Sequence, residues 1–384
     1  MPANAPFDLA VVGAGIVGLG CALAAARLGK GVVVIDRDAQ ANGASVRNFG
    51  FITVTGQARG EMWARARRTR DVWAEIAAEA GVAVLHEGLL LAVRRPESVA
   101  VLEAFLETEM GAGCRLLDPA EVARRHPPMA APGMLAALWS PHELRVESRE
   151  AIPKLARWLE RDHGVIFLRE TAALSVETGS VVTTRGPVQA GAIAVCPGDH
   201  LSSLFSERIA AQGVTRCKLQ MLRLADPGFR LPGGVMSDLG LVRYAGYSAL
   251  PEAQALRVRL EREQPGHLDN GVHLIAVQSA DGSLVVGDSH HYATTPDPFG
   301  CEAVDGLILN EFEAVFGRKA PRVLERWTGT YASAAGRTAV IDTPTPGVRL
   351  VMVTTGAGAS TGFALGEEVV ADLFEGERAW RMTV

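Results

Sequence analysis

Residues 7–38 read FDLAVVGAGIVGLGCALAAARLGKGVVVIDRD, and this stretch decides the fold of the chain. Two short apolar runs, 9–12 and 32–35, are typical of buried parallel strands. The small residues over 16–28 predict a helix between them, and two glycines follow at its end. A strand, a glycine turn, a helix and a second strand form the βαβ unit that binds dinucleotides.

Gly13, Gly15 and Gly18 stand at the turn in the G-x-G-x-x-G spacing. The first permits the tight turn, the second lets a pyrophosphate approach the backbone, and the third lets the helix pack closely on the sheet. Asp36 follows Gly13 by 23 positions, where a carboxylate accepts hydrogen bonds from ribose hydroxyls and repels a 2′-phosphate. The motif therefore predicts FAD or NAD rather than NADP. A glycine-rich turn in another kind of α/β protein is the alternative.

The composition bounds the class of protein. With 384 residues, 48% hydrophobic and 21% charged, the chain is long enough for two domains and typical of soluble globular proteins. A formal net charge of −5 argues against a nucleic-acid-binding surface. The five cysteines form no CxxC pair, which indicates reduced thiols rather than disulfides or a metal site. We expect a cytoplasmic protein without signal peptide, membrane span or bound metal.

The segment after Asp36 interrupts the βαβ rhythm. It is a loop in which Ser45, Arg47, Asn48 and Gly50 can offer polar groups and close backbone approach to a cofactor, although an ordinary surface loop is the alternative. The pattern that follows predicts helices over 58–80 and 97–109, a hairpin over 82–93 with its turn at 87–88, and a short helix capped by Asp118. These elements do not belong to a dinucleotide fold, so they indicate an inserted second domain.

The α/β pattern returns near residue 146. It predicts a helix over 148–161, a strand over 165–168, a hairpin over 172–184 and a strand over 192–196 that ends at Pro197 and Gly198. Between 215 and 297 four short alternating segments (KLQMLRLADP, LVRYAGYSAL, GVHLIAVQSA and SLVVGDSHHY) predict an antiparallel sheet that covers a substrate cavity. A helix over 301–316 follows.

A second glycine-rich turn lies near the end of the chain. The strand 348–354 leads into TGAGASTGF, which opens a helix. The N-terminus of a helix stabilises negative charge, and a reduced flavin ring carries such charge at N1 and O2. An NAD domain has no use for this turn, so it favours FAD.

Together these segments resemble the FAD-dependent amine oxidoreductases, a superfamily that includes D-amino-acid oxidase, glycine oxidase and sarcosine oxidase. The resemblance covers essentially the whole chain. It rests on GAGIVGLG at 13–20, Cys196-Pro197-Gly198, Trp327-Thr328-Gly329 and the C-terminal TTGAGASTGF. It implies an α/β fold with a discontinuous Rossmann-type FAD-binding domain (1–57, 145–212 and 322–384) and an inserted α+β substrate domain on an antiparallel sheet (58–144 and 213–321).

The resemblance also implies the cofactor site. It assigns non-covalent FAD, because no residue matches the covalent attachment point of monomeric sarcosine oxidases. The expected FAD-binding residues are Gly13, Gly15, Ile16, Val17, Gly18, Asp36, Arg37, Ser45, Arg47, Asn48, Gly50, Phe51, Ala173, Pro197, Gly198, Gly356, Gly358, Ala359, Ser360 and Thr361.

Four strings point to a narrower group. ASVRNFGFITVTGQ, SPHELRVESREAIP, KLQMLR and VGDSHHY are similar to bacterial FAD oxidoreductases proposed to act in the catabolism of aminophosphonates related to 2-aminoethylphosphonate. Glycine-oxidase-type enzymes carry an arginine for the substrate carboxylate two residues after the glycine that matches Gly329. Here that position is Tyr331, which puts the usual α-amino acid in doubt.

The reaction implied is oxidation of a small amine, most simply an N-methylated or hydroxylated 2-aminoethylphosphonate. A hydride passes to flavin N5, the imine hydrolyses to an aldehyde, and O2 or another acceptor takes up the electrons. The alternatives are a glycine, sarcosine or D-amino-acid oxidase or dehydrogenase and, in a different class, a non-catalytic NAD-binding protein or complex subunit. No catalytic residue is singled out. The expected substrate-binding residues are Gln220, Arg243, Tyr244, His290, His291, Tyr331 and Arg337, of which the adjacent histidines cannot both face the cavity on a regular strand.

Overall fold

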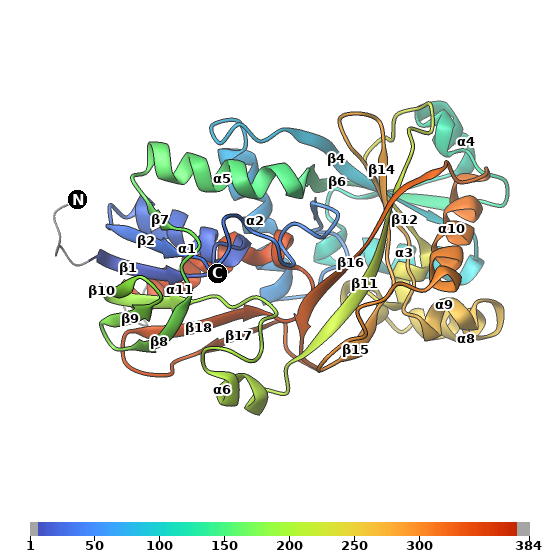
Figure 1. The fold of residues 1–384 in the computed structure, drawn as a ribbon. Helices are drawn as coiled ribbons and strands as arrows, with labels where there is room; N and C mark the ends of the chain where they lie inside the picture. Colours follow the sequence, from blue (N-terminus) through green and yellow to red (C-terminus); the bar gives the residue numbers. More distant parts are fainter. Residues whose placement is uncertain (1–6, 375–384) are drawn as a thin grey trace.

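The structure is a computed structural model that describes residues 7–374. The outer ends of the expected FAD-binding domain, 1–6 and 375–384, lie outside the described residues. Two sheets side by side organise the chain, and the long strands β11 (Thr215–Leu224) and β16 (Val323–Ser333) run diagonally between the two halves in Figure 1.

The first sheet has eight strands and carries the N-terminal motif. Five of them pair in parallel, in the order β18, β10, β1, β2, β7, because their apolar runs are buried on both faces. Antiparallel β17 extends one edge, and the hairpin β8–β9 continues from β10. The bounds are β1 Phe7–Val12, β2 Val32–Ile35, β7 Ile166–Leu168, β8 Ala173–Glu177, β9 Ser180–Thr183, β10 Gly186–Val195, β17 Ala339–Asp342 and β18 Val348–Val353.

Helices α1 (Ile16–Arg27) and α11 (Gly358–Phe374) pack tightly together next to this sheet. A Cβ added at Gly20 would lie 2.6 Å from the carbonyl oxygen of Gly362, and one at Gly366 would lie 2.4 Å from the carbonyl carbon of Gly20. Only glycine permits this approach. Helix α2 (Glu61–Ile76) packs on α11, and α5 (Ser148–Asp162) packs on α1.

The second sheet has ten strands in mixed order. It places β11 between β15 and β14 and continues through β13, β12, β4 and β6 to β3, while β16 pairs with β11 and β5 with β6. The remaining bounds are β3 Phe51–Ile52, β4 Val84–Val93, β5 Arg115–Leu117, β6 Ala136–Val146, β12 Gly234–Ser237, β13 Ile275–Gln278, β14 Leu284–Gly287 and β15 His291–Ala293.

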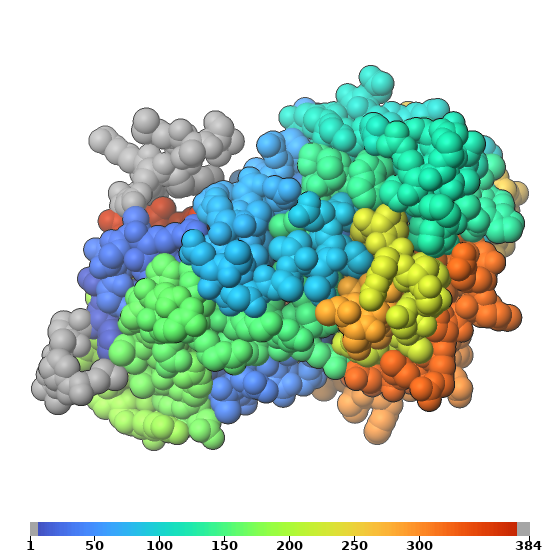
Figure 2. All heavy atoms as spheres, turned by 90° about the horizontal axis from the view of Figure 1, so that it is seen from above, coloured from blue at the N-terminus to red at the C-terminus, as the bar shows by residue number. Residues whose placement is uncertain are grey.

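The helices of this half come from distant parts of the chain. In Figure 2 their teal, yellow and orange segments gather on the right, away from most of the blue and green residues of the first sheet. Their bounds are α3 Pro96–Leu106, η1 Glu109–Gly111, α4 Pro119–Arg125, η2 Pro127–Met129, η3 Asp238–Val242, α7 Ala245–Ser248, α8 Ala253–Glu263, α9 Pro265–Asp269 and α10 Glu302–Phe316; α6, Ser206–Ala211, belongs to the other end.

Two sequence-based predictions of local structure are wrong. The expected hairpin over 82–93 is one strand, β4. Gly88, with φ +85°, makes an irregularity in its pairing with β6 rather than a turn. The expected strand LVRYAGYSAL is helical, as η3 and α7, because Tyr247 is buried against Phe105 and Gly246 packs on the backbone of Gly56.

The expected domain boundaries cut across the second sheet at two points. Strands β3 and β16 lie in ranges that were assigned to the FAD-binding domain, and both pair with the second sheet. Among the described residues, no helix is both long enough and apolar enough to cross a membrane.

Candidate active site

The glycine turn of the first motif has the contacts that its spacing predicts. Gly13 has φ +104°, and a Cβ there would lie 2.4 Å from the carbonyl oxygen of Cys196 at the end of β10. A Cβ at Gly18 would lie 1.9 Å from the carbonyl oxygen of Gly13. These contacts hold the start of α1 directly against the strand ends, which leaves its first amides at the rim of a cavity.

This first cavity has a volume of about 340 Å³. Asp36 stands at its edge, where its carboxylate accepts hydrogen bonds from the amides of Ala14 at 2.6 Å and Asp38 at 2.9 Å. The fixed carboxylate and the glycine cradle fit the ribose and pyrophosphate of a dinucleotide. The expected cofactor residues that line this cavity are Gly13, Gly15, Asp36, Arg37, Ser45, Ala173, Pro197 and Gly198.

The loop after β2 connects this cavity to a second one. Ser45 accepts a hydrogen bond from the amide of Ile16 at 2.9 Å, so the loop lies over the start of α1. Asn48 lines the second cavity, but its amide group serves the loop: it donates to Ala44 at 2.6 Å and accepts from the amide of Gly50 at 2.7 Å. A Cβ at Gly50 would lie 1.8 Å from the carbonyl oxygen of Val146, so this glycine allows close contact with β6.

Several expected cofactor residues line neither cavity. Ile16 is buried under α11, Val17 packs into the core, and Arg47 bonds Asn42 beside a separate surface hollow. Gly18 and Gly358 serve helix packing, and the Thr361 hydroxyl donates to the carbonyl of Ala357, the residue before α11.

The second cavity, about 360 Å³, has the C-terminal glycine turn as one wall. Gly356, Ala359 and Ser360 line it there, and Phe51 lines it from β3. The Ser360 hydroxyl accepts from the amide of Thr53 at 2.8 Å, and the indole of Trp73 donates to the Ala359 carbonyl at 3.1 Å. Because both halves of the protein hold this turn, the start of α11 is fixed at the cavity.

Another wall of the second cavity is polar. The guanidinium of Arg243 donates to the hydroxyl of Tyr292 at 3.2 Å, and Tyr244 and Tyr331 lie beside them. Tyr331 also packs on the glycine turn, since a Cβ at Gly356 would lie 2.8 Å from its ring. The polar wall therefore meets the glycine turn at Tyr331.

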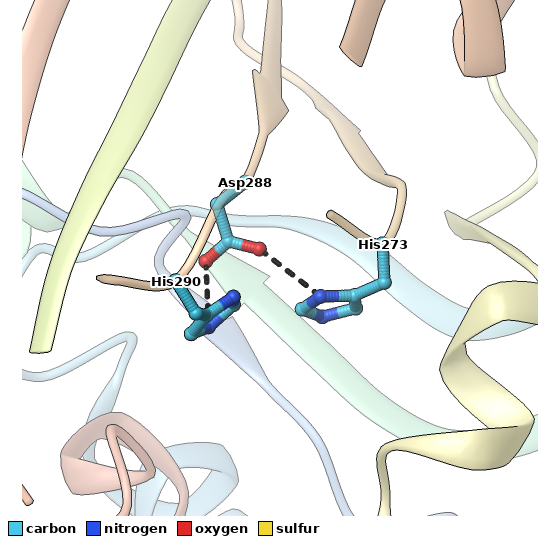
Figure 3. Close-up of side chains that lie close together, drawn as sticks. All are labelled: His273, Asp288 and His290. Carbon is cyan, nitrogen blue, oxygen red and sulfur yellow. Dashed lines mark ion pairs between the residues drawn. The ribbon is translucent and has the colours of Figure 1, made fainter. Parts of the chain in front are cut away.

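Behind Arg243 lies a buried cluster of two histidines and one aspartate, shown in Figure 3. Asp288 stands between them: its Oδ1 is 3.4 Å from Nδ1 of His273, and its Oδ2 is 3.6 Å from Nε2 of His290. Nδ1 of His290 is 2.8 Å from the carbonyl oxygen of Gly271, and Nε2 of His273 is 3.4 Å from the hydroxyl of Tyr244. We call these three side chains the His–Asp–His cluster.

Burial sets the charge of the His–Asp–His cluster. It raises the pKa of Asp288 to about 7, although the positive charge of Arg243 acts in the opposite direction. It lowers the pKa of both His273 and His290 well below the ordinary value, and Arg243 lowers them further. Near neutral pH the histidines are therefore uncharged, and Asp288 is poised between its acid and its carboxylate.

The same three side chains are of the kinds that bind metal ions, and their donor atoms lie within 4.8 Å of one another. However, Asp288 already has the positive charge of Arg243 beside it, which opposes a divalent cation. Each histidine also faces a different oxygen of the carboxylate. We therefore interpret the cluster as a set of proton-holding groups.

Three of the expected substrate residues lie elsewhere, and these expectations were wrong. The Gln220 amide donates to Asp305 at 2.6 Å, because this side chain lies on the face of β11 that packs on α10. His291 is 3.0 Å from the Asn270 side chain, and Arg337 is exposed and bonds Gln212. Of the adjacent histidines only His290 lines the cavity, as strand alternation requires.

The sequence interpretation missed His273, Asp288 and Tyr292. Asp288 and Tyr292 stand in the VGDSHHY string that was singled out, within four positions of His290. His273 comes from the segment before β13, and only the folded sheet brings it to the others.

The model of the family described as FAD dependent oxidoreductase matches residues 8–373 of this chain. The chain belongs to this family. FAD is therefore its cofactor, and the protein is a flavin-dependent oxidoreductase; the NAD-binding alternative is wrong. None of the curated proteins compared with the chain matches it.

Solved structures share the fold. Glycine oxidase from Bacillus cereus superposes with a TM-score of 0.75 at 16% identity, covering 97% of this chain and 96% of its own. L-Proline dehydrogenase from P. horikoshii gives 0.76 at 18% identity with 97% and 94% covered. Iminodiacetate oxidase from Chelativorans sp. BNC1 gives 0.71 at 19% identity with 96% and 95% covered. At such identities the similarity establishes the fold alone.

Proposed function

We propose that the protein oxidises a small aminophosphonate, of the N-methylated or hydroxylated 2-aminoethylphosphonate type, to an aldehyde such as phosphonoacetaldehyde. One observation carries this proposal: Arg243, Tyr292, Tyr331 and His290 converge on one wall of the cavity that the C-terminal glycine turn bounds. A phosphonate has three oxygens and up to two negative charges, so it needs several donors at once.

We assign the two cavities to the two parts of FAD. The ADP part fits the first cavity, with Asp36 at the ribose and the amides at the start of α1 at the pyrophosphate. The flavin fits the second, with the start of α11 at its pyrimidine edge. The residues from Ala44 to Phe51 run from one cavity to the other, as a dinucleotide in this position requires.

The bound flavin supplies the acceptor for the hydride that leaves the α-carbon of the amine. The side chains of the protein position the substrate. Arg243 and the tyrosines hold the anionic head, which leaves the amine end toward the glycine turn, and the apolar side chains Phe51, Met62 and Leu219 keep the site poor in water. The overall reaction converts the amine, O2 and water into an aldehyde, H2O2 and the released nitrogen group, which is methylamine from an N-methylated substrate and ammonia from a primary amine.

A second candidate is an amino-acid or sarcosine oxidase or dehydrogenase. One arginine beside tyrosine hydroxyls can also bind a carboxylate at two points. A substrate that bonds only Arg243 and Tyr292, and none of the other donors on the wall, therefore favours this candidate.

Turnover assays decide between these candidates. The purified holoenzyme is offered N-methyl-2-aminoethylphosphonate, 1-hydroxy-2-aminoethylphosphonate, 2-aminoethylphosphonate, sarcosine, glycine and D-alanine, with oxygen consumption, peroxide and trapped aldehyde as readouts. The proposal predicts turnover of a phosphonate with a kcat/KM at least about a hundredfold above any carboxylate. Turnover of the carboxylates alone would contradict it. Amine oxidation without stoichiometric peroxide would indicate an electron carrier in place of O2.

A further inference from the structure

The His–Asp–His cluster faces the anion-binding wall with too few protons to satisfy its acceptors. The 2.8 Å contact from Nδ1 of His290 to a carbonyl oxygen means that Nδ1 carries the proton, so Nε2 of the neutral ring is an acceptor. That nitrogen faces Oδ2 of Asp288 at 3.6 Å. Two acceptors that face each other attract a proton between them.

The other side of the cluster also lacks a hydrogen bond. Nδ1 of His273 and Oδ1 of Asp288 are 3.4 Å apart, and neither atom has a hydrogen-bond partner in the described structure. Both side chains are buried, with 3% and 6% of their surface exposed. An unsatisfied buried polar atom is costly, so a further proton or donor here lowers the free energy.

Arg243 and the His–Asp–His cluster determine the charge of the wall, because the other titratable side chains near them are neutral. The titratable groups whose charges act on Asp288 are Arg243 and Tyr244, between η3 and α7, and Cys217 of β11. Tyr292 of β15 and Tyr331 of β16 stand beside Arg243. Burial raises the pKa of Tyr244 and Tyr331 above the ordinary value and that of Cys217 to about 11, which keeps these three neutral. His291, on the far side of His290, is outside the cavity.

We propose that binding of the anionic head of the substrate is coupled to proton uptake by the His–Asp–His cluster, so that the site matches the charge of a phosphonate dianion. This inference rests on the proposed function. With Asp288 ionised, Arg243 and the cluster carry no net charge together; one proton makes them +1 and a second makes them +2. A phosphonate near neutral pH carries between one and two negative charges, whereas a carboxylate carries one. A phosphonate therefore draws in more protons than a carboxylate does.

The charge of Asp288 explains why binding of an anion favours proton uptake. As a carboxylate behind Arg243, Asp288 repels an incoming anion, and as a neutral acid it becomes a donor to Nε2 of His290 and no longer repels the anion. Protonation thus converts the one repulsive group on the wall into a supporting one. A structural aspartate would instead keep its charge when the anion binds.

Calorimetry of the FAD-loaded enzyme tests this inference. Methylphosphonate, which has no amine to oxidise, and acetate are titrated at pH 8 in two phosphate-free buffers that differ in ionisation enthalpy. The difference in apparent binding enthalpy gives the number of protons taken up. We expect about one proton per methylphosphonate, clearly fewer for acetate, and a methylphosphonate Kd that rises up to about tenfold between pH 8 and pH 9.

Two variants make the result specific. Asp288→Asn removes the carboxylate at constant size, so proton uptake should fall to near zero and the Kd should become independent of pH. His291→Gln, next to the cluster but outside the cavity, should behave as the wild type. If Asp288→Asn does not fold, His290→Gln replaces it, and its proton uptake should likewise fall.

The outcomes separate the two proposals. Equal enthalpies in both buffers with tight methylphosphonate binding would overturn the proton coupling and leave the proposed function intact. Proton uptake that persists in the folded cluster variants would also overturn it. Absence of methylphosphonate binding would contradict both proposals. One equivalent of a transition metal in the purified enzyme would contradict the coupling, because a metal would occupy the proton positions.

Discussion

At the residue scale, we propose that Arg243 determines which substrates the cavity accepts. Among the described residues that line this cavity, it is the one arginine or lysine, and its guanidinium bonds the hydroxyl of Tyr292. Hydrogen bonds between charged groups contribute about 1.5–3 kcal/mol each, so losing this side chain outweighs any other single change on the wall.

Replacing Arg243 with methionine should therefore lower kcat/KM for the aminophosphonate about a hundredfold to a thousandfold, while FAD stays bound because the arginine is remote from the dinucleotide motif. Steady-state kinetics and the flavin spectrum measure both. Arg337→Met is the matched control, since Arg337 is exposed and outside the cavity. Equal losses in the two variants would contradict the assignment.

The raised pKa of Asp288 predicts that the free energy of unfolding depends on pH. Its pKa is about 7 in the folded protein and about 4 when unfolded, so the folded state binds the extra proton between these values and loses stability as pH rises through this window. Asp288→Asn lacks this loss. Its melting temperature should exceed that of the wild type at pH 8, by the equivalent of as much as about 4 kcal/mol, and the advantage should shrink at pH 4. A difference that does not change with pH would show that folding leaves the pKa of Asp288 unshifted, and would contradict this prediction.

Single residues could be predicted where a local pattern carries them. Strand alternation separates His290 from His291, and the turn spacing places Gly13 and Asp36. The prediction for Gln220 was wrong. One face of β11 packs on α10 and the other borders the cavity, and a single sequence does not show which side chains lie on which face. His273 was missed because it reaches Asp288 only through the pairing of β13 with β14.

At the element scale, the two glycine-initiated helices are the parts of the fold that we propose position FAD. Helix α1 starts at the first cavity and α11 at the second, and the close contact between Gly20 and Gly362 fixes one against the other. Because each helix presents its N-terminus, both cavities can bind negative charge.

Gly18→Ala should weaken FAD binding by at least about a hundredfold, which corresponds to about 2.8 kcal/mol, because its Cβ would lie 1.9 Å from the carbonyl oxygen of Gly13 and would displace α1 from the turn. Fluorescence titration of the apoprotein with FAD measures the affinity. Gly306→Ala in α10 is the control: no atom lies within 4 Å of its added Cβ, so its FAD affinity should equal that of the wild type. Unchanged affinity in Gly18→Ala would contradict this role of α1.

Elements were predictable where periodicity was strong. The apolar strands, the helices α2 and α10 and the Asp118 cap, which accepts from the Glu121 amide at 2.7 Å, follow from local rules. The segment 241–250 looked like a strand because apolar and aromatic residues recur in it. Its helices form since Tyr247 is buried against Phe105, a tertiary contact that overrides local propensity.

At the scale of the whole molecule, the cofactor region joins the two sheets. Thr53 follows β3 of the second sheet, and Trp73 comes from the range that was expected to form the substrate domain; both bond the start of α11. Arg65 and Arg68 of α2 pair with Glu368 and Glu367 of α11. A ligand held in both cavities therefore stabilises both halves.

We expect FAD to raise the stability of the whole protein in one transition. At an FAD concentration one hundred times its Kd, the free energy of unfolding should increase by about 2.7 kcal/mol, with both halves unfolding together. Calorimetry of apoprotein and holoenzyme gives the shift, and limited proteolysis shows which segments are protected. Two separate transitions, only one of which responds to FAD, would contradict this account.

The overall order of the chain was visible in the sequence, because two glycine turns at opposite ends belong to one cofactor. The boundaries between the halves were not, since β3 and β16 pair with the second sheet through partners distant in the chain. The polar wall was predicted only in part: Arg243, Tyr244, His290 and Tyr331 were expected to bind substrate, whereas His273, Asp288 and Tyr292 were not, because segments distant in the chain meet there only in the folded protein.

The most direct test of the account is anaerobic reduction of the bound flavin. The holoenzyme is mixed with N-methyl-2-aminoethylphosphonate or with sarcosine in a stopped-flow instrument, and the loss of the visible flavin band is followed. The account predicts fast, complete bleaching by the phosphonate and slow or no bleaching by sarcosine, with the difference abolished in Arg243→Met. Fast bleaching by sarcosine, with the phosphonate inert, would contradict it and identify the cavity as a carboxylate site.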